Sequence, residues 1–242
     1  MTHKSAGVLV TGGSRGIGRA CCDLLAGQDI PVVSLSRTRP GALHDNETHY
    51  QTDLSDLPAT LSVVREILRR HPLDAIVCNA GRGDIGSLEN FSAHQIQQSI
   101  LFNLANPIGL ARECLPYLRQ QARSNIVFIG STSALQGGRY GTLYSAAKFG
   151  LRGAAQALGY EASGANCHVG IVHPGSVRTG FFDALNFEPG PEPAHAIEAI
   201  DVAMAVSQML SSPNSAVISE LVVKPRQHVM KKRRVNCETT KR

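Results

Sequence analysis

The amino-acid sequence predicts a single α/β domain, with a doubly wound parallel sheet of about seven strands and helices on both of its faces. Short apolar runs rich in Val and Ile alternate with segments of helical period along the 242 residues. Continuous apolar strands separated by helices are typical of parallel sheets that are buried on both faces. A hydrophobic content of 43% is enough for a large core, and the length suits one domain.

Strands are predicted where β-branched and apolar residues cluster between turn residues. The expected strands cover residues 7–11, 31–36, 48–52, 74–79, 125–131, 168–173 and 219–223. The segments between them carry the period of helices. The expected helices cover residues 16–27, 57–70, 92–120, 141–161 and 195–210, and Pro107 can interrupt the third. The Pro-rich segment 186–193 is expected to be a long irregular loop, of the kind that often covers a functional site.

Charge and cysteine content narrow the class of protein. The formal charge is +5, but residues 224–242 hold eight Lys/Arg and one acid, so the rest of the chain is slightly acidic. We therefore expect a domain over 1–225 and a solvated basic tail over 226–242, with an anion-binding arm as the alternative, and no nucleic-acid partner. The six cysteines show no CxxC spacing and the histidines no HExxH motif, so neither disulfides nor a metal site is expected. No apolar run could span a membrane and no signal peptide precedes the first strand, so we expect a cytoplasmic protein.

The segment VLVTGGSRGIGRA joins the first predicted strand to the first predicted helix. Its glycines Gly12, Gly16 and Gly18 permit a tight turn and let a pyrophosphate approach the backbone at the start of the helix. An ordinary strand–helix turn is the alternative, because the spacing is GxxxGxG and not the GxGxxG of the commonest dinucleotide motif. The strand before the turn and the helix after it favour cofactor binding.

The second predicted strand ends in VVSLSRT, with Ser36 and Arg37 where an NAD-binding site usually has an acid. Arg15, in the glycine turn, is a second cation near the same place. Two guanidinium groups can bind one phosphate through charge-assisted hydrogen bonds, so the sequence favours NADP over NAD. The alternative is that both are ordinary surface arginines.

The segment YGTLYSAAKFG, residues 140–150, places two tyrosines before one lysine. Residues four apart lie on the same face of a helix, so Tyr144 and Lys148 can point to one spot, whereas Tyr140 drifts off that face. An ammonium group near a phenol favours the phenolate, so we expect the pKa of Tyr144 to be lowered and Tyr144 to be the reactive phenol. The alternative is a buried aromatic residue that only packs.

Six motifs follow one another in a fixed order: TGGSRGIG (11–18), CNAG (78–81), FNLANP (102–107), IGSTSA (129–134), YSAAK (144–148) and HPGSVRTG (173–180). In this combination the chain resembles the short-chain dehydrogenase/reductase family in its compact, Rossmann-like, single-domain form. The resemblance implies that Tyr144 is the general acid/base, Lys148 its electrostatic partner and Ser131 the hydroxyl that orients a carbonyl. It also implies that Asn103 supports a water-linked proton relay with Lys148.

The glycine turn, the strand ends and the resemblance together predict two sets of contacts. The expected cofactor contacts are Gly12, Ser14, Arg15, Gly16, Ile17, Gly18, Ser36, Arg37, Asp53, Leu54, Asn79, Ala80, Gly81, Tyr144, Lys148, Pro174, Gly175, Val177 and Thr179. The expected substrate contacts are Ser131, Ser133, Tyr144 and Phe181.

These residues predict an NADP(H)-dependent oxidoreductase that transfers a hydride between the cofactor and a carbonyl or secondary alcohol of a small substrate. Two alternatives are a 3-oxoacyl-carrier-protein reductase and a non-catalytic NADP-sensing protein on the same fold. The small residues of helix 141–161 invite close helix packing. In the family this helix commonly forms an oligomer interface, so the resemblance implies a homodimer or homotetramer.

Overall fold

The seven predicted strands form one sheet in the computed structural model, which describes residues 6–164, 166–213 and 215–233. Every neighbouring pair runs parallel, in the order β3-β2-β1-β4-β5-β6-β8. The predicted doubly wound fold is therefore confirmed. The strands are β1 (Gly7–Thr11), β2 (Val32–Ser36), β3 (Glu47–Gln51), β4 (Leu73–Cys78), β5 (Ser124–Ile129), β6 (Cys167–Pro174) and β8 (Glu220–Val223).

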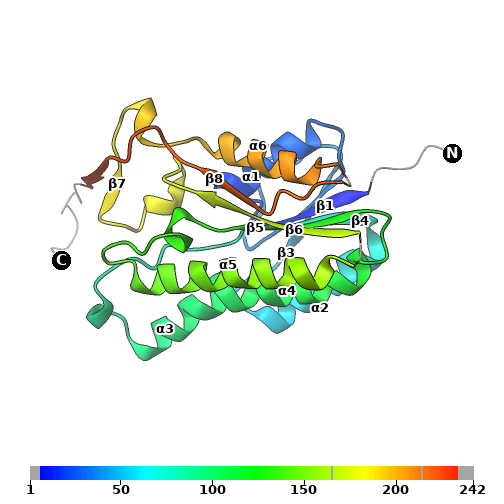
Figure 1. Cartoon of the computed structure of the whole chain (residues 1–242), viewed down its shortest axis with the longest axis horizontal. Coiled ribbons are helices and arrows are strands. Elements are labelled where there is room, and N and C mark those ends of the chain that lie inside the picture. The colour runs from blue at the N-terminus through cyan, green and yellow to red at the C-terminus, as the bar shows by residue number, and fades with distance from the viewer. Residues whose placement is uncertain (1–5, 165, 214, 234–242) are drawn as a thin grey trace.

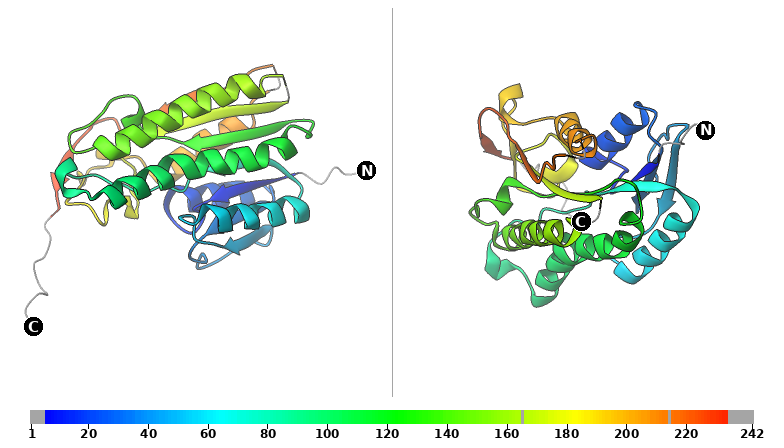
Figure 2. Two further views of the ribbon diagram at one scale, coloured as in Figure 1. Left: turned by 90° about the horizontal axis from the view of Figure 1, so that it is seen from below. Right: turned by 45° about the vertical axis from the view of Figure 1, so that its right-hand side comes forward.

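Helices cover both faces of this sheet (Figure 1). They are α1 (Gly16–Ala26), α2 (Leu57–Arg70), α3 (Ala93–Ile100), α4 (Asn106–Leu118), α5 (Thr142–Ala162) and α6 (Ala199–Leu210). Helices α1 and α6 pack together on one face, and α2, α4 and α5 lie side by side on the other (Figure 2). Because successive strand residues point to opposite faces, Val8 and Val10 join the core under α1 while Leu9 joins the core on the other side.

The strand order reverses between β1 and β4. From β1 the chain winds outward to β2 and β3, and from β4 it winds the other way to β5, β6 and β8. In open parallel sheets, ligands bind in the crevice outside the carboxyl ends of the strands at such a reversal. The topology therefore places a candidate site beyond the ends of β1 and β4.

The predicted helix 92–120 is divided by a π-helical turn, Leu101–Ala105, between α3 and α4. Pro107 lies in the first turn of α4, directly after the π-helical turn, and the helical backbone continues through it. Asn103 lies within the π-helical turn and is buried. Such turns occur often at functional sites because the wider turn re-aims its side chains.

The chain after β6 differs from the sequence-based expectation in two places. Segment 186–193 is not wholly irregular, because β7 (Phe187–Pro189) pairs antiparallel with β9 (Met230–Lys232). The first part of the expected solvated tail is therefore bound to the body, and only residues 234–242 of it lie outside the described chain. Helix α6 begins at Ala199 instead of residue 195, since the capping box of Glu198 and Asp201 starts it there.

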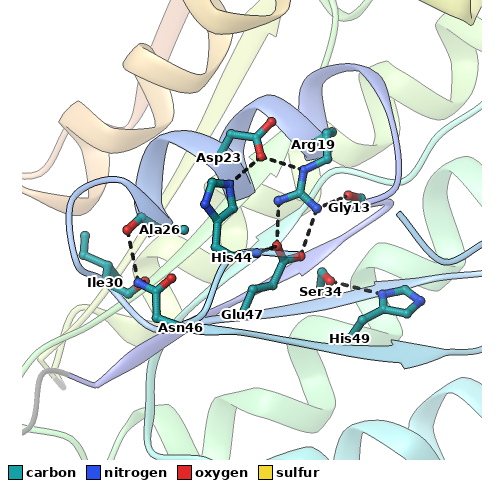
Figure 3. Close-up of polar contacts among 10 residues, drawn as sticks. All are labelled: Gly13, Arg19, Asp23, Ala26, Ile30, Ser34, His44, Asn46, Glu47 and His49. Carbon is teal, nitrogen blue, oxygen red and sulfur yellow. Dashed lines mark hydrogen bonds and ion pairs between the residues drawn. The ribbon is translucent and has the colours of Figure 1, made fainter. Parts of the chain in front are cut away.

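A cluster of polar side chains ties α1 to β3 beside the glycine turn (Figure 3). The Arg19 guanidinium donates to both carboxylate oxygens of Glu47 at 2.9 and 2.8 Å, and it also reaches Asp23 at 2.9 Å and the Gly13 carbonyl at 3.3 Å. Burial alone would raise the pKa of Glu47, but the hydrogen bonds and charge of Arg19, together with hydrogen bonds from Ser34 and the His44 N–H, outweigh it and the pKa is lowered. Through its contact with the Gly13 carbonyl, the Arg19–Glu47 ion pair stabilises the backbone of the glycine turn.

Glu47→Gln should lower the free energy of unfolding by about 2 kcal/mol at neutral pH, because it leaves the Arg19 charge without its buried partner. A carboxyl group whose pKa is lowered by folding stabilises the fold at pH values above its ordinary pKa. The difference in unfolding free energy between the wild type and Glu47→Gln should therefore shrink as the pH falls below about 4.5. Urea unfolding of the wild type and of Glu47→Gln across this pH range measures the difference. The matched control is Glu66→Gln, which breaks an exposed pair with Arg70 and should cost under about 0.5 kcal/mol. Equal losses in the two variants would contradict the prediction.

Candidate functional site

A cleft of about 1260 Å³ lies at the reversal of strand order. Six strands of the main sheet each contribute a lining residue that ends the strand or directly follows it, among them Gly12, Ser36, Asn79, Gly130, Pro174 and Lys224. The cleft therefore opens at the carboxyl ends of β1, β2, β4, β5, β6 and β8, where the topology predicts a ligand.

The glycine turn forms one end of the cleft. Gly12 and Gly16 have φ values of 71° and 58°, in the left-handed region that a side chain disfavours. Helix α1 starts at Gly16 after Arg15, and the Arg15 side chain makes no capping hydrogen bond to the first turn. The N–H groups at the start of α1 are thus available to an anion such as a pyrophosphate.

Gly18, which the sequence predicts as a cofactor contact, does not line the cleft. It is buried, and a Cβ atom there would overlap the Gly12 carbonyl and the Asn79 amide. That amide donates to the Thr11 carbonyl at 2.8 Å, and the Thr11 hydroxyl accepts from the Asn79 N–H at 3.0 Å. The third glycine therefore serves the close packing of α1 on β1 and β4, and its contact with the cofactor stays a prediction.

The cleft is strongly basic beside the end of β2. Arg15, Arg37 and Arg39 line it, and Asp53 is the one acid among the lining residues that the structure describes. The Asp53 carboxylate already accepts from the Ser55 N–H at 3.0 Å and the Ser55 hydroxyl at 2.8 Å, and these bonds lower its pKa. This end of the cleft fits the phosphates of a nucleotide cofactor in both charge and backbone geometry.

The predicted catalytic side chains meet in the middle of the cleft. Tyr144 and Lys148, in the first turns of α5, line it and are 8% and 3% exposed. The Lys148 ammonium donates to the Ile129 carbonyl at 2.9 Å and lies 5.7 Å from the centre of the Tyr144 ring. Ser131 follows β5 at the same spot, and a hydrogen bond with the Ser131 hydroxyl acts on the Tyr144 phenol.

Ser131 is held from two sides. Its hydroxyl accepts from the Ser133 N–H at 3.1 Å, and its carbonyl is 3.1 Å from Nδ1 of the buried His173. A carbonyl can only accept, so His173 donates there as a ring protonated on Nδ1. Burial lowers the pKa of His173, which keeps this ring neutral.

The pKa of Tyr144 moves against the sequence-based expectation. Burial raises it to about 12, although the hydrogen bond with Ser131 acts in the opposite direction. Burial also lowers the pKa of Lys148 to about 8, because a buried ammonium loses its hydration. Burial thus decides the direction of the Tyr144 pKa, and the phenol keeps its proton at neutral pH.

This pKa can be checked by titrating phenolate absorbance without cofactor. A raised pKa means that Tyr144 stays protonated while ordinary tyrosines ionise near pH 10. The wild type and Tyr144→Phe should therefore give the same titration curve up to about pH 10. An additional step near neutral pH, present only in the wild type, would contradict the raised value.

Asn103 lies behind the cleft and does not line it. Its side-chain oxygen accepts from the Arg82 N–H at 3.0 Å and its amide donates to Asp84 at 3.3 Å. Asn103 and Lys148 flank Gly81, since a Cβ atom there would be 3.4 Å from Asn103 Oδ1 and 3.6 Å from Lys148 Nζ. The predicted pair is thus brought together around Gly81, with Asn103 on the protein side.

The other predicted contacts all line the cleft. Besides those described above, they are Ser14, Ile17, Leu54, Ala80, Gly81, Gly175, Val177, Thr179, Ser133 and Phe181. Some lining residues were not predicted from the sequence: Thr38, Arg39, Ser55 and Arg82, each within two positions of a predicted one, and His228 and Met230 from the C-terminal segment. The first four could have been found from their position beside predicted contacts, whereas no local sequence pattern marks His228 and Met230.

A family model described as short chain dehydrogenase matches residues 6–189. The chain belongs to the short-chain dehydrogenase family. The family is one of oxidoreductases, and its sequence motifs are those that converge on the cleft.

Relatives of this short-chain dehydrogenase are named for several different activities. Sepiapterin reductase of Chlorobaculum tepidum is 26% identical over 238 residues, which cover 90% of this chain and 95% of that protein. The 3-oxoacyl-[acyl-carrier-protein] reductase FabG of Buchnera aphidicola is 28% identical over 184 residues, covering 73% of this chain and 75% of that protein. The solved structure of ElxO with NADP bound has a TM-score of 0.81 at 22% identity, covers 91% of this chain and 98% of that chain, and shows the shared fold.

The cleft of this short-chain dehydrogenase has an aromatic wall, formed by Phe181, Phe182 and Phe187. The Phe181 ring is 5.8 Å from the Tyr144 ring, and consecutive rings of the wall are 5.3 and 6.1 Å apart. Arg82, on the other side of the cleft, is paired with Asp84 at 2.9 Å.

None of the described helices is long and apolar enough to cross a membrane, and the described residues hold no group of three or more His, Cys, Asp or Glu suited to a metal ion.

Proposed function

We propose that this protein is an NADP(H)-dependent oxidoreductase that interconverts a carbonyl group and a secondary alcohol on a small substrate. The observation that carries the proposal is the meeting of the Tyr144 phenol, the Ser131 hydroxyl and the Lys148 ammonium in one cleft. The other end of that cleft is lined by three arginines and a glycine turn. A dinucleotide along this cleft would bring its reactive ring to the three groups.

The bound nicotinamide cofactor would supply or accept the hydride. The residues of this chain would do the rest. In the reducing direction Tyr144 donates its proton to the carbonyl oxygen as the carbon accepts the hydride, so that an alcohol forms. Ser131 hydrogen-bonds to the same oxygen and orients it, while the Lys148 ammonium favours the phenolate that remains. Burial keeps the phenol protonated beforehand, which suits a proton donor.

The basic end of the cleft favours NADP over NAD. Arg37 directly follows β2, Arg39 lies two residues further on, and Arg15 directly precedes α1. No acid stands at the end of β2, where an NAD site usually binds the ribose hydroxyls. A 2′-phosphate would gain charge-assisted hydrogen bonds from these guanidinium groups. Pro174, Gly175 and Thr179 would hold the nicotinamide end.

The decisive experiment follows NADPH oxidation by the full chain with a panel of ketones, aldehydes, quinones, 3-oxo acids and 3-oxoacyl thioesters. We expect turnover with at least one carbonyl class. Turnover with 3-oxoacyl thioesters alone would favour the carrier-protein reductase alternative. Tight NADPH binding without turnover on any member would favour the NADP-sensing alternative and overturn the proposed function.

The exposed face of α5 supports self-association. Ala146, Phe149, Gly153, Ala157 and Tyr160 are exposed along it, and the large side chains among them are apolar. Small residues let a second helix approach closely, and exposed aromatic residues can then pack across the contact. A homodimer or homotetramer stays a prediction.

A further inference from the structure

The segment after β8 lies along the substrate side of the cleft. We call residues 226–233 the C-terminal strap. Two of its side chains, His228 and Met230, line the cleft, and Met230 Sδ lies 3.5 Å from the hydroxyl of the buried Ser176. The proposed chemistry uses neither residue, yet the strap reaches the same cleft as Tyr144.

The backbone of the strap is bound to the segment that carries the aromatic wall. Strand β9 of the strap pairs with β7, which begins at Phe187. Three further backbone hydrogen bonds of 2.9 Å flank this ladder, from Gln227 N to Ala194 O, from Gly190 N to Val229 O and from Arg233 N to Asn186 O. The strap therefore follows segment 186–194 over most of its length.

Arg233 fastens the end of the strap beside the wall. Its guanidinium donates to the Phe182 carbonyl at 3.0 Å and to the Asp183 carboxylate at 3.4 Å, and lies 3.9 Å from Glu188. The neighbouring Lys231 adds an ion pair with Glu188 at 3.1 Å. The Arg233 side chain thus contacts both the backbone of a wall residue, Phe182, and two nearby carboxylates.

The wall is confined from the opposite side as well. The Phe181 ring lies against Gly83 so closely that a Cβ atom on that glycine would overlap the ring, at 2.6 Å from Cζ. Phe181 also contacts the Tyr144 ring, with the two ring centroids 5.8 Å apart. Without the strap, segment 181–189 would lose most of its fixed partners on the outer side.

We propose that His228 and Met230 of the C-terminal strap are part of the substrate site, with Arg233 a positioning residue that holds the aromatic wall in place beside Tyr144. The site would then take carbonyl substrates with a flat apolar group, of the size of a phenyl ring, next to the carbonyl. Aromatic side chains favour such groups by burial and by ring–ring contact. A wall that is fixed beforehand avoids the cost of ordering it on binding. This inference rests on the proposed function.

The test compares Arg233→Ala with Lys232→Ala in the full chain. Lys232 is the adjacent base, is exposed and forms no ion pair in the described part of the chain, so it is the matched control. The probes are 1-phenylpropane-1,2-dione and butane-2,3-dione. Arg233→Ala should raise the KM for the phenyl dione about tenfold with kcat nearly unchanged. The variant loses contacts that bind the substrate and the transition state equally, while the reacting groups stay in place. The KM for butanedione and the Kd for NADPH should stay the same, and Lys232→Ala should match the wild type.

A second readout does not need turnover. Chymotrypsin cleaves after phenylalanine, and cleavage after Phe181, Phe182 and Phe187, identified by mass, should be about tenfold faster in Arg233→Ala than in Lys232→Ala. Equal cleavage in the two variants, or an unchanged KM for the phenyl dione, would overturn the proposed strap. A wild type that oxidises NADPH with other carbonyls but prefers butanedione over the phenyl dione would overturn the substrate class. Should the wild type turn over no carbonyl at all, the proposed function fails and the cleavage rates still decide the role of the strap.

Discussion

Tyr144→Phe should lower kcat about 10³-fold, because it removes the one group placed to give the substrate oxygen a proton. The aromatic ring and its contact with Phe181 remain, so packing changes little. The Kd for NADPH should stay within about twofold of the wild type, since the hydroxyl makes a small part of the cofactor contact. Steady-state turnover and a fluorescence titration with NADPH measure the two quantities on the same preparation.

Tyr140→Phe is the matched control for this variant. Tyr140 lies in the loop before α5, is 50% exposed and carries the Arg139 guanidinium over its ring at 4.8 Å. Loss of its hydroxyl should leave kcat within about twofold of the wild type, because it removes no group from the reacting centre. A Tyr144→Phe variant with wild-type turnover would show that another group donates the proton.

The second large effect is expected at the basic end of the cleft. Arg37→Asp should lower kcat/KM for NADPH about 10²-fold, since it removes a charge-assisted hydrogen bond and places a like charge near the 2′-phosphate. The same carboxylate can accept from ribose hydroxyls, so kcat/KM for NADH should rise. The ratio of the two cofactors is the measurement, because an effect on folding alone would change both in the same direction.

Arg69→Asp controls for the change of net charge. Arg69 lies in the last turn of α2, is exposed and contacts only the Arg65 carbonyl, at 3.1 Å, among the described hydrogen bonds. Its replacement should leave the cofactor ratio unchanged at moderate salt, because distant exposed charges are screened. An unchanged ratio in Arg37→Asp would refute the assignment of this arginine to the phosphate.

Periodicity and residue order predicted much of the molecule, and the reasons are physical. A buried strand needs apolar side chains on both faces, so the central strands were visible as short runs such as GVLVT, whereas the edge strand β3, ETHYQ, is mostly polar and partly exposed. The pairing of Tyr144 with Lys148 follows from the helical repeat, which requires only local geometry. The cleft at the ends of the strands follows from the fold itself.

The features that escaped prediction depend on contacts between distant parts of the chain. Strands β7 and β9 have three residues each and form because they meet, not because either has a strand pattern. The orientation of Asn103 depends on a π-helical turn that no residue type specifies. The pKa of Tyr144 rises because of burial, which spacing does not report. Gly18 fits a motif for ligand contact, yet its missing side chain serves the packing of α1.

The pairing of β9 with β7 has a consequence for the order of biosynthesis. Chains emerge from the ribosome amino end first, and folded units can form before synthesis is complete. Strands β1 to β5 and the glycine turn are translated well before residues 226–233. The half of the molecule that carries the glycine turn is therefore available for folding first, and segment 186–194 gains its pairing partner only once residues 226–233 have left the ribosome.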